Sequence, residues 1–260
     1  MKASDLLAPR VPAVDHTSPL PFYAQVKDAI RESIERGDWK PGDQIPGEAE
    51  LCTFFGVSRT VVRQALTELV YEGLIVRASG KGTFVAEAKI TENLAQKLTG
   101  FYEDMATLGL STLSQVLTQR LIAANTRIAG YLEVPPGTSV IEIERLRFVQ
   151  DEPLVLVTTY VPYARCPSLL QADLSRHSLY ALMEKQCGIV ISRGRRAFEA
   201  VAASQREAEL LRVERGAPLM LLDSVSFMED GTPVEYYHAL HRGDRSRFEA
   251  DLLRVREPSA

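Results

Sequence analysis

Two arginines four positions apart, Arg59 and Arg63, are the residues of this 260-residue chain whose type and spacing allow the most specific recognition chemistry. Residues at i and i+4 leave one face of a helix, so both guanidinium groups would point the same way near the helix N-terminus. In a DNA major groove an arginine can donate two hydrogen bonds to one guanine. The alternative interpretation is a solvated helix face, on which both side chains contact only water.

Three predicted helices and a hairpin would position these arginines. An amphipathic helix between residues 20 and 37 comes first, and a second helix begins behind Pro46. Ser58 is a suitable N-cap for the third helix, which carries both arginines. The apolar stripe of that helix consists of Val62, Ala65, Leu66, Leu69 and Val70. A Gly80-Lys81-Gly82 turn between two short strands follows, and this order predicts a winged helix-turn-helix that binds DNA.

Composition restricts where a nucleic acid could bind. The net charge of -4 at pH 7 excludes a uniformly basic surface, so the positive potential must be local. Arg77 and Lys81 lie close in sequence to the two arginines of the third helix. These four cations predict one basic face on an otherwise acidic protein.

The cysteine pattern and the lack of long apolar runs indicate the cellular compartment of the protein. Cys52, Cys166 and Cys187 are scattered without CxxC spacing, which predicts neither a disulfide framework nor a zinc site and favours a reducing environment. The first twenty residues hold no continuous apolar run, and no apolar stretch approaches membrane-spanning length. We therefore expect a cytoplasmic protein without membrane contact, metal or cofactor.

Residues 21 to 85 resemble the DNA-binding domain of the GntR family of bacterial transcription regulators. The resemblance is carried by a Pro-x-Glu segment at Pro46, a Gly-Val-Ser-Arg-x-x-Val-Arg-x-Ala-Leu segment from Gly56, and a Gly-x-Gly-Thr-Phe-Val wing from Gly80. It implies that both arginines read bases. The DNA-binding residues that it implies are Ser58, Arg59, Thr60, Val61, Arg63, Gly80, Lys81 and Gly82.

Within this implied site, Ser58 and Thr60 would hold phosphates, and the glycine turn would place the tip of the wing. Two positions depart from the family pattern. Ala49 stands where many relatives have a further arginine, and Val61 replaces a common threonine, so it could touch a thymine methyl group but cannot form a hydrogen bond. We therefore expect an operator sequence of its own for this chain.

The remaining chain is organised as an internal duplication. A helix, a Gly turn and two strands between residues 124 and 161 return 79 positions later, so that Ala129 matches Ala208 and Phe148 matches Phe227. Two helix-and-hairpin units predict one pseudo-symmetric α+β domain built on an antiparallel sheet.

The duplication is broken at two arginines. Arg145 and Arg147 share one face of a strand with isoleucines and valine, whereas the second copy has Ser224 and Ser226. A charge on an apolar face needs a partner, because burying it alone costs too much free energy. The arginines therefore either satisfy nearby acids or line a pocket for an anionic ligand through forked hydrogen bonds.

Other side chains could belong to either arrangement. Glu199 and Glu235 are the acids that a structural arginine pair could meet. Arg193 and Arg195, which also share one face of a strand, could join either the ion pairs or the pocket.

This second region resembles the UTRA ligand-sensing domain of the HutC branch of GntR regulators, whose fold is similar to that of chorismate lyase. The resemblance runs from about Leu98 to Leu252 and rests on segments such as Ser178-Leu179-Tyr180 and Gly231-Thr232-Pro233-Val234-Glu235. It implies an effector pocket with an anion site of backbone amides at a helix start. With Arg193 from the strand pattern, the predicted effector-binding residues are Thr99, Gly100, Phe101, Arg145, Arg147, Ser178, Arg193, Glu235 and His241.

Two of these positions depart from the family pattern. His241 stands where relatives often have an aromatic hydroxyl, and Gly100 where a serine is common. A histidine on a strand is either a ligand contact or a structural residue with its own partner, so both interpretations of His241 stay open.

The sequence thus predicts a tail at residues 1–18, a winged helix-turn-helix domain at 19–86, a linker at 87–97 and an effector-binding and dimerisation domain at 98–254. We expect a homodimer that binds a pseudo-palindromic double-stranded operator and is released by a small anionic metabolite, either a phosphate ester or a carboxylate. A constitutive dimeric DNA-binding protein is the alternative. An enzyme is disfavoured, because the candidates include no Ser/His/Asp arrangement, Cys/His pair or metal-ligand spacing.

Overall fold

The computed structural model describes residues 14–15, 17–78, 80, 82–87, 89–92 and 101–251. Three predicted site residues, Lys81, Thr99 and Gly100, lie outside the described residues. The chain divides into two compact units, Met1–Ala88 and Lys89–Ala260. In the part of the chain that the structure describes, none of the helices has the length and apolar character needed to cross a membrane.

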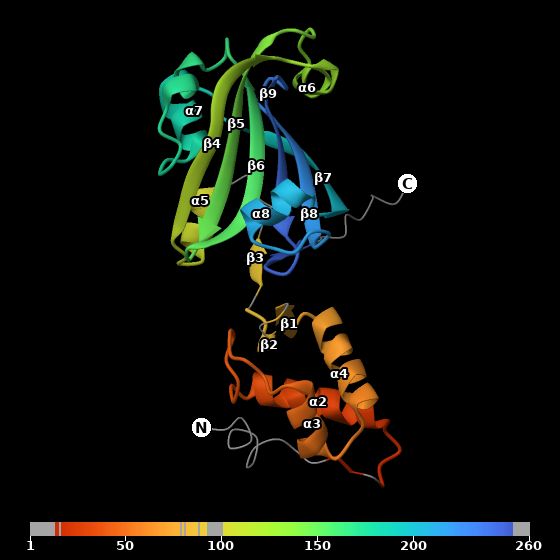
Figure 1. The fold of residues 1–260 in the computed structure, drawn as a ribbon. Helices are drawn as coiled ribbons and strands as arrows, with labels where there is room; N and C mark the ends of the chain where they lie inside the picture. Colours follow the sequence, from red (N-terminus) through yellow and green to blue (C-terminus); the bar gives the residue numbers. More distant parts are fainter. Residues whose placement is uncertain are drawn as a thin grey trace, which may run out of the picture. The chain divides into compact units, whose positions relative to one another are not determined.

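The first unit is a three-helix bundle followed by a hairpin (Figure 1). Gly56 ends the second helix in the left-handed conformation, at φ +67°, which favours glycine. Ser58 caps the third helix by accepting a hydrogen bond from the backbone N–H of Val61, as predicted. The elements are α2 (Phe22–Glu35), α3 (Glu48–Phe55), α4 (Arg59–Tyr71), β1 (Ile75–Ala78) and β2 (Gly82–Val85).

The core of this unit fixes the orientation of α4. Four of the five residues predicted for its apolar stripe are buried, but Val70 is 37% exposed and lies at the edge of the stripe. The core residues come from all three helices and both strands, with Ile30 of α2, Leu51 of α3 and Ile75 of β1 fully buried. Arg59, Arg63 and Thr67 on the opposite face of α4 are exposed.

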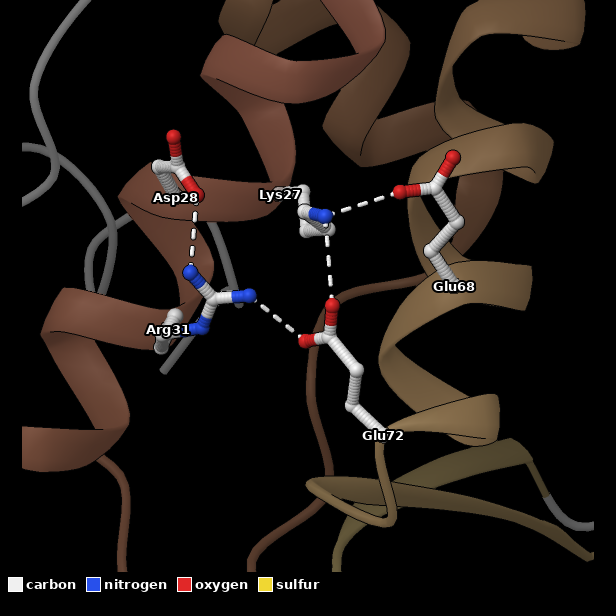
Figure 2. Close-up of polar contacts among 5 residues, drawn as sticks. All are labelled: Lys27, Asp28, Arg31, Glu68 and Glu72. Atoms are coloured by element: carbon white, nitrogen blue, oxygen red, sulfur yellow. Dashed lines mark hydrogen bonds and ion pairs between the residues drawn. The ribbon is translucent and has the colours of Figure 1, made fainter.

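A charged network joins α2 to α4 (Figure 2). Lys27 Nζ lies 2.8 Å from Glu68 Oε2 and 3.1 Å from Glu72 Oε1, and Arg31 Nη2 lies 2.6 Å from Glu72 Oε2. Arg31 also pairs with Asp28 at 2.9 Å. The hydrogen bond from Arg31 lowers the pKa of Glu72, and the hydrogen bond to Glu68 raises the pKa of Lys27. Glu68 of α4 and Glu72, the residue that caps its C-terminal end, thus neutralise cations of α2 at the end of the helix away from Arg59.

The second unit contains a six-stranded antiparallel sheet in the order β4-β5-β6-β9-β8-β7 (Figure 1). Its strands are β4 (Thr112–Ala123), β5 (Ser139–Val149), β6 (Glu152–Pro162), β7 (Arg193–Ala202), β8 (Pro218–Phe227) and β9 (Pro233–Arg242). A short parallel pair joins β3 (Ile90–Glu92) to β10 (Ser246–Phe248). The helices are α5 (Phe101–Thr107), α6 (Thr126–Leu132), α7 (Leu179–Cys187), α8 (Gln205–Leu211) and the 3-10 helix η2 (Pro167–Gln171).

The register confirms the predicted duplication and extends it by one strand. The strands β4 and β7 precede the two copies and occupy the two ends of the sheet order, so each repeat is strand, helix, hairpin. Thr158 of β6 pairs with His238 of β9 at the junction of the repeats. Each repeat's helix also forms an ion pair with the other repeat's strand, Arg127 with Asp223 at 3.0 Å and Arg206 with Glu144 at 2.6 Å.

The helices cover the two faces of the sheet in different ways. On one face α6 and α8 pack on apolar clusters that contain Leu132 and Leu211. On the other face α5 and α7 pack on clusters that contain Met105 and Met183. The duplication accounts for both pairs of helices, because α5 precedes β4 as α7 precedes β7, and residues 101–107 shifted by 79 positions fall within α7. On the second face the two copies differ at Arg145 and Arg147, where the second copy has Ser224 and Ser226.

One sequence prediction about the cysteines is wrong. Cys166, which directly precedes η2, and Cys187, the last residue of α7, form a disulfide with their Cα atoms 5.5 Å apart. Sequence spacing could not indicate this pairing, because 21 positions separate the residues and only the packing of α7 on η2 brings them together. The expectation of no metal site stays a prediction; among the described residues there is no group of three His, Cys, Asp or Glu that could hold a metal ion.

Candidate DNA-binding surface and effector pocket

The exposed face of α4 carries the predicted DNA-binding side chains. Arg59, Thr60 and Arg63 are exposed at the N-terminal end of the helix, and Val61 is half-buried. Arg63 has a side chain that is 64% exposed, and its Nε lies 3.7 Å from Glu48 Oε1 on α3. Such an exposed ion pair contributes little stability, so Arg63 can exchange Glu48 for a base edge at little cost.

The wing is described on both sides of its tip. Gly80 has φ +69° and Gly82 has φ +124°, which are conformations that glycine adopts without strain. A Cβ atom at Gly82 would collide with the side chain of Gln44. The backbone of Gln44 forms an isolated antiparallel β-bridge with Phe84 of the wing. Glycine at these two positions therefore fits the backbone path of the hairpin.

In the second unit, a cavity lies on the sheet face covered by α5 and α7. Its volume, measured as the space open to the centres of water molecules, is about 50 Å³. The sheet supplies side chains from β5, β6, β8 and β9, and the two helices supply the opposite wall. Its lining includes the predicted residues Phe101, Arg145, Arg147, Ser178, Glu235 and His241.

The two arginines enter this cavity from β5. Arg145 is 1% exposed, and its Nε and Nη2 have no hydrogen-bond partner among the described residues. Burial, together with the charge of Arg147, lowers the pKa of Arg145 to about 9. Arg147 has its guanidinium carbon 4.8 Å from the ring centre of Phe101, and burial lowers its pKa as well. Two like charges thus line one cavity, and in the described part of the chain some of their N–H groups have no acceptor.

Glu235 does not supply those partners. Its Oε2 accepts hydrogen bonds from Tyr180 Oη and Ser226 Oγ, both at 2.8 Å. Burial raises the pKa of Glu235, although the two hydroxyl donors and the charge of Arg145 oppose that shift. The carboxylate is therefore fixed beside the arginines by neutral donors, and Glu199, the other acid considered from sequence, lies on the exposed edge strand β7.

His241 connects the cavity to the short strand β3. Its Nδ1 lies 3.0 Å from Glu92 Oε1, and the two side chains are 2% and 1% exposed. Because Nδ1 contacts the Glu92 carboxyl group, Nε2 is the ring nitrogen left for another partner. Nε2 is buried without a hydrogen-bond partner in the described part of the chain. His241 thus has a structural partner and also faces the cavity.

Comparison with known proteins identifies the two units. Residues 22–85 match the family described as bacterial regulatory proteins, gntR family, and residues 107–247 match the UTRA domain. The transcriptional repressor NagR of Bacillus subtilis is 34% identical over 235 residues, which cover 90% of this chain and 96% of NagR. The chain belongs to the GntR family.

Two further relatives of this GntR regulator support the assignment to the HutC branch. The histidine utilization repressor of Pseudomonas putida is 33% identical over 231 residues, covering 89% of this chain and 92% of the relative. The crystal structure of PhnF from Mycobacterium smegmatis is 31% identical, with a TM-score of 0.62, and covers 88% of this chain and 99% of PhnF. The GntR protein is therefore a ligand-responsive transcription regulator and not an enzyme.

One predicted pocket residue of this GntR regulator lies elsewhere. Arg193 pairs with Phe227 across β7 and β8, and its guanidinium carbon lies 3.9 Å from the centre of the Phe227 ring. Arg195 pairs with Val225 and points to that same face. Phe227 and Val225 belong to the cluster under α6, so both arginines are on the face opposite the cavity. Arg193 and Arg195 thus share one face of β7, as the alternation predicts, but that face is not the one that lines the cavity.

The cavity also contains residues that sequence reasoning missed. Tyr237 lies two positions after Glu235 on β9, and continuing the strand alternation from Glu235 to His241 would have found it. Tyr180 lies two positions after Ser178, whose hydroxyl caps α7 by accepting from the N–H of Ala181. No local signal could have indicated Glu92, because it reaches His241 across 149 positions.

Proposed function

We propose that this GntR regulator is a homodimeric repressor that leaves a pseudo-palindromic operator when a small organic anion binds the UTRA cavity. The observation that carries the proposal is the pair Arg145 and Arg147, held inside the cavity with buried donors that lack partners among the described residues. Unpaired buried cations cost free energy, and an anion would supply the missing acceptors. The alternative, a structural arginine pair, requires acids that accept from these donors.

Chemistry around the arginines restricts the anion. Arg145 and Arg147 suit a phosphate ester or a carboxylate, since guanidinium donors match both geometries. Glu235 can accept from a hydroxyl or an amine of the ligand, and Tyr180 and Tyr237 add hydroxyl groups. We infer an effector with an acidic group at one end and hydroxyl or amine donors at the other. Sugar phosphates, amino acids and organic acids have this form.

The proposed link to DNA binding runs through β3. Glu92 is within hydrogen-bonding distance of His241, and Ile90 N–H donates to the carbonyl of Arg245 beside β10. A ligand that contacts His241 Nε2 would therefore act on the segment that follows the wing in sequence. A difference of about 1 to 3 kcal/mol in ligand binding between two states changes operator affinity by up to about a hundredfold.

On the DNA side, the proposal assigns base recognition to Arg59 and Arg63 and phosphate contacts to Ser58, Thr60 and the wing glycines. One winged helix covers only a half-site, so a two-fold dimer on a pseudo-palindrome would double the contact. The chromosome is the expected target, which places the regulator in the cytoplasm.

A ligand screen tests the proposal. Glucose 6-phosphate, histidine, citrate and neutral glucose are added to the full-length protein, and the unfolding midpoint is followed. A ligand that prefers the folded state must raise the midpoint. We expect an anion and not its neutral analogue to do so, and the same anion to weaken operator binding in fluorescence anisotropy. A panel widened to other sugar phosphates and acids that yields only neutral ligands would contradict the proposal.

A further inference from the structure

The disulfide between Cys166 and Cys187 ties the C-terminal end of α7, the helix whose first residues line the cavity, to the residue before η2. Cys166 is fully buried, whereas Cys187 is half-buried at the end of α7. The hydroxyl of Ser168 lies 3.6 Å from the Cys166 sulfur and 3.4 Å from the Cys187 sulfur. The Cys187 sulfur is thus in the more exposed residue, the Cys166 sulfur is in a buried one, and the Ser168 hydroxyl is close enough to donate to either.

The loop that this disulfide closes carries part of the cavity wall. Residues 167–186 lie between the two cysteines, and Ser178, Leu179 and Tyr180 at the start of α7 line the cavity. Other bonds hold the middle of the loop, because the carbonyl of Ser175 accepts from Tyr102 Oη at 2.8 Å. The C-terminal end of α7 is where the disulfide adds a covalent restraint.

The size of the cavity makes that restraint relevant to ligands. A volume of about 50 Å³ accommodates only a few water molecules. A larger organic molecule must displace side chains of the lining, and α5 and α7 supply the part of the lining that does not belong to the sheet. Restraining α7 therefore opposes entry.

We propose that Cys187 and Cys166 are a reversible oxidation site at which a peroxide closes the disulfide and restrains α7. The Cys187 thiolate attacks one peroxide oxygen, the O–O bond breaks, and a sulfenic acid and hydroxide form. The Cys166 thiol then attacks the Cys187 sulfur, the S–O bond breaks, and the hydroxyl group leaves as water. Overall, two thiols and one hydrogen peroxide give one disulfide and two waters, and a cytoplasmic dithiol reductant reverses the change.

The inference goes beyond the proposed function. The restraint of α7 by oxidation does not depend on any effector or on its chemical class. A reduced response to an effector after oxidation rests on the proposed function, because it requires the cavity to be the effector site. The experiment below measures the restraint of α7 without any ligand.

The test uses the full-length Cys52→Ser variant, in which only the two cysteines of the proposed site remain. The matched control is Cys52→Ser combined with Cys187→Ser, which cannot form the disulfide. Each protein is fully reduced, desalted and exposed to equimolar hydrogen peroxide, and its free thiols are counted. Hydrogen exchange of the α7 amides is then compared between the peroxide-treated and the reduced protein.

We expect peroxide to remove both thiols within one chain and to slow exchange in α7 at least about tenfold, because the closed loop loses most of its open conformations. Exchange in α4 of the first unit should not change, and the control should show no difference in α7. Two thiols that persist after peroxide, disulfides formed between chains, or equal α7 exchange in both states would each overturn the proposal. A ligand screen without hits would leave these outcomes unaffected.

Discussion

Replacing Arg145 and Arg147 together by serine is expected to abolish the ligand response while leaving the fold intact. The second repeat already has Ser224 and Ser226 at the equivalent positions, so the sheet tolerates serine there. A structural arginine pair would instead make this variant unfold. The double substitution therefore separates the two interpretations of the pair.

The expected change in stability follows from the burial of Arg145. A pKa lowered from 12.5 to about 9 corresponds to about 5 kcal/mol of unfavourable free energy for the charged form. Because the folded-state pKa is still above 7, the guanidinium remains charged at neutral pH and this cost is present there. Water in the cavity and the loss of side-chain packing in the variant reduce the net gain, so we expect the variant to be more stable by about 1 to 3 kcal/mol.

The expected change in ligand binding is larger and opposite in sign. A hydrogen bond to a charged group contributes about 1.5 to 3 kcal/mol, so losing two arginines should weaken anion binding at least about a hundredfold. Urea unfolding measures the stability, and the thermal-shift and anisotropy assays measure the ligand and operator responses.

The matched control substitutes serine for Arg127 and Arg206, which stand at equivalent positions in the two repeats. Their side chains are 62% and 60% exposed and form ion pairs on the face of the sheet opposite the cavity. It should keep the ligand response and change stability by about 1 kcal/mol or less per pair. If the variant without Arg145 and Arg147 unfolds at lower urea than the wild type, or still responds to the anion, the reasoning is refuted.

Three further predictions concern the first unit and the assembly. Arg63→Ala should weaken operator binding by about 1 to 3 kcal/mol and leave random DNA binding nearly unchanged in competition anisotropy; equal losses would make Arg63 a phosphate contact. Glu72→Gln should lower the free energy of unfolding by about 0.5 to 1 kcal/mol at pH 7. Because Arg31 lowers the pKa of Glu72 below 4.5, this difference from the wild type in urea unfolding should fade as the pH falls below that value. A difference that is unchanged at pH 3 would contradict the prediction. Light scattering should give twice the chain mass of 28.9 kDa, and a monomer that occupies the operator with one head would contradict the dimer.

Patterns among neighbouring residues were enough to predict many of the helices, turns and hairpins of this protein. The cap at Ser58, the left-handed Gly56 and the i,i+4 arginines depend on neighbouring residues alone, so the sequence predicted the exposed face of α4. The repeat of 79 positions predicted the two hairpins, because a strand's alternation and a turn's glycine are local as well. The alternation also placed Arg145 and Arg147 on one face.

Tertiary structure decided which groups from distant segments meet. The face to which Arg193 points depends on the register of β7 against β8, and a shift by one residue reverses the face of every side chain. The disulfide and the contact of His241 with Glu92 join residues 21 and 149 positions apart, and no local pattern encodes such distances. These contacts form only when the helices and strands pack, because the free energy that selects them comes from burying both segments together.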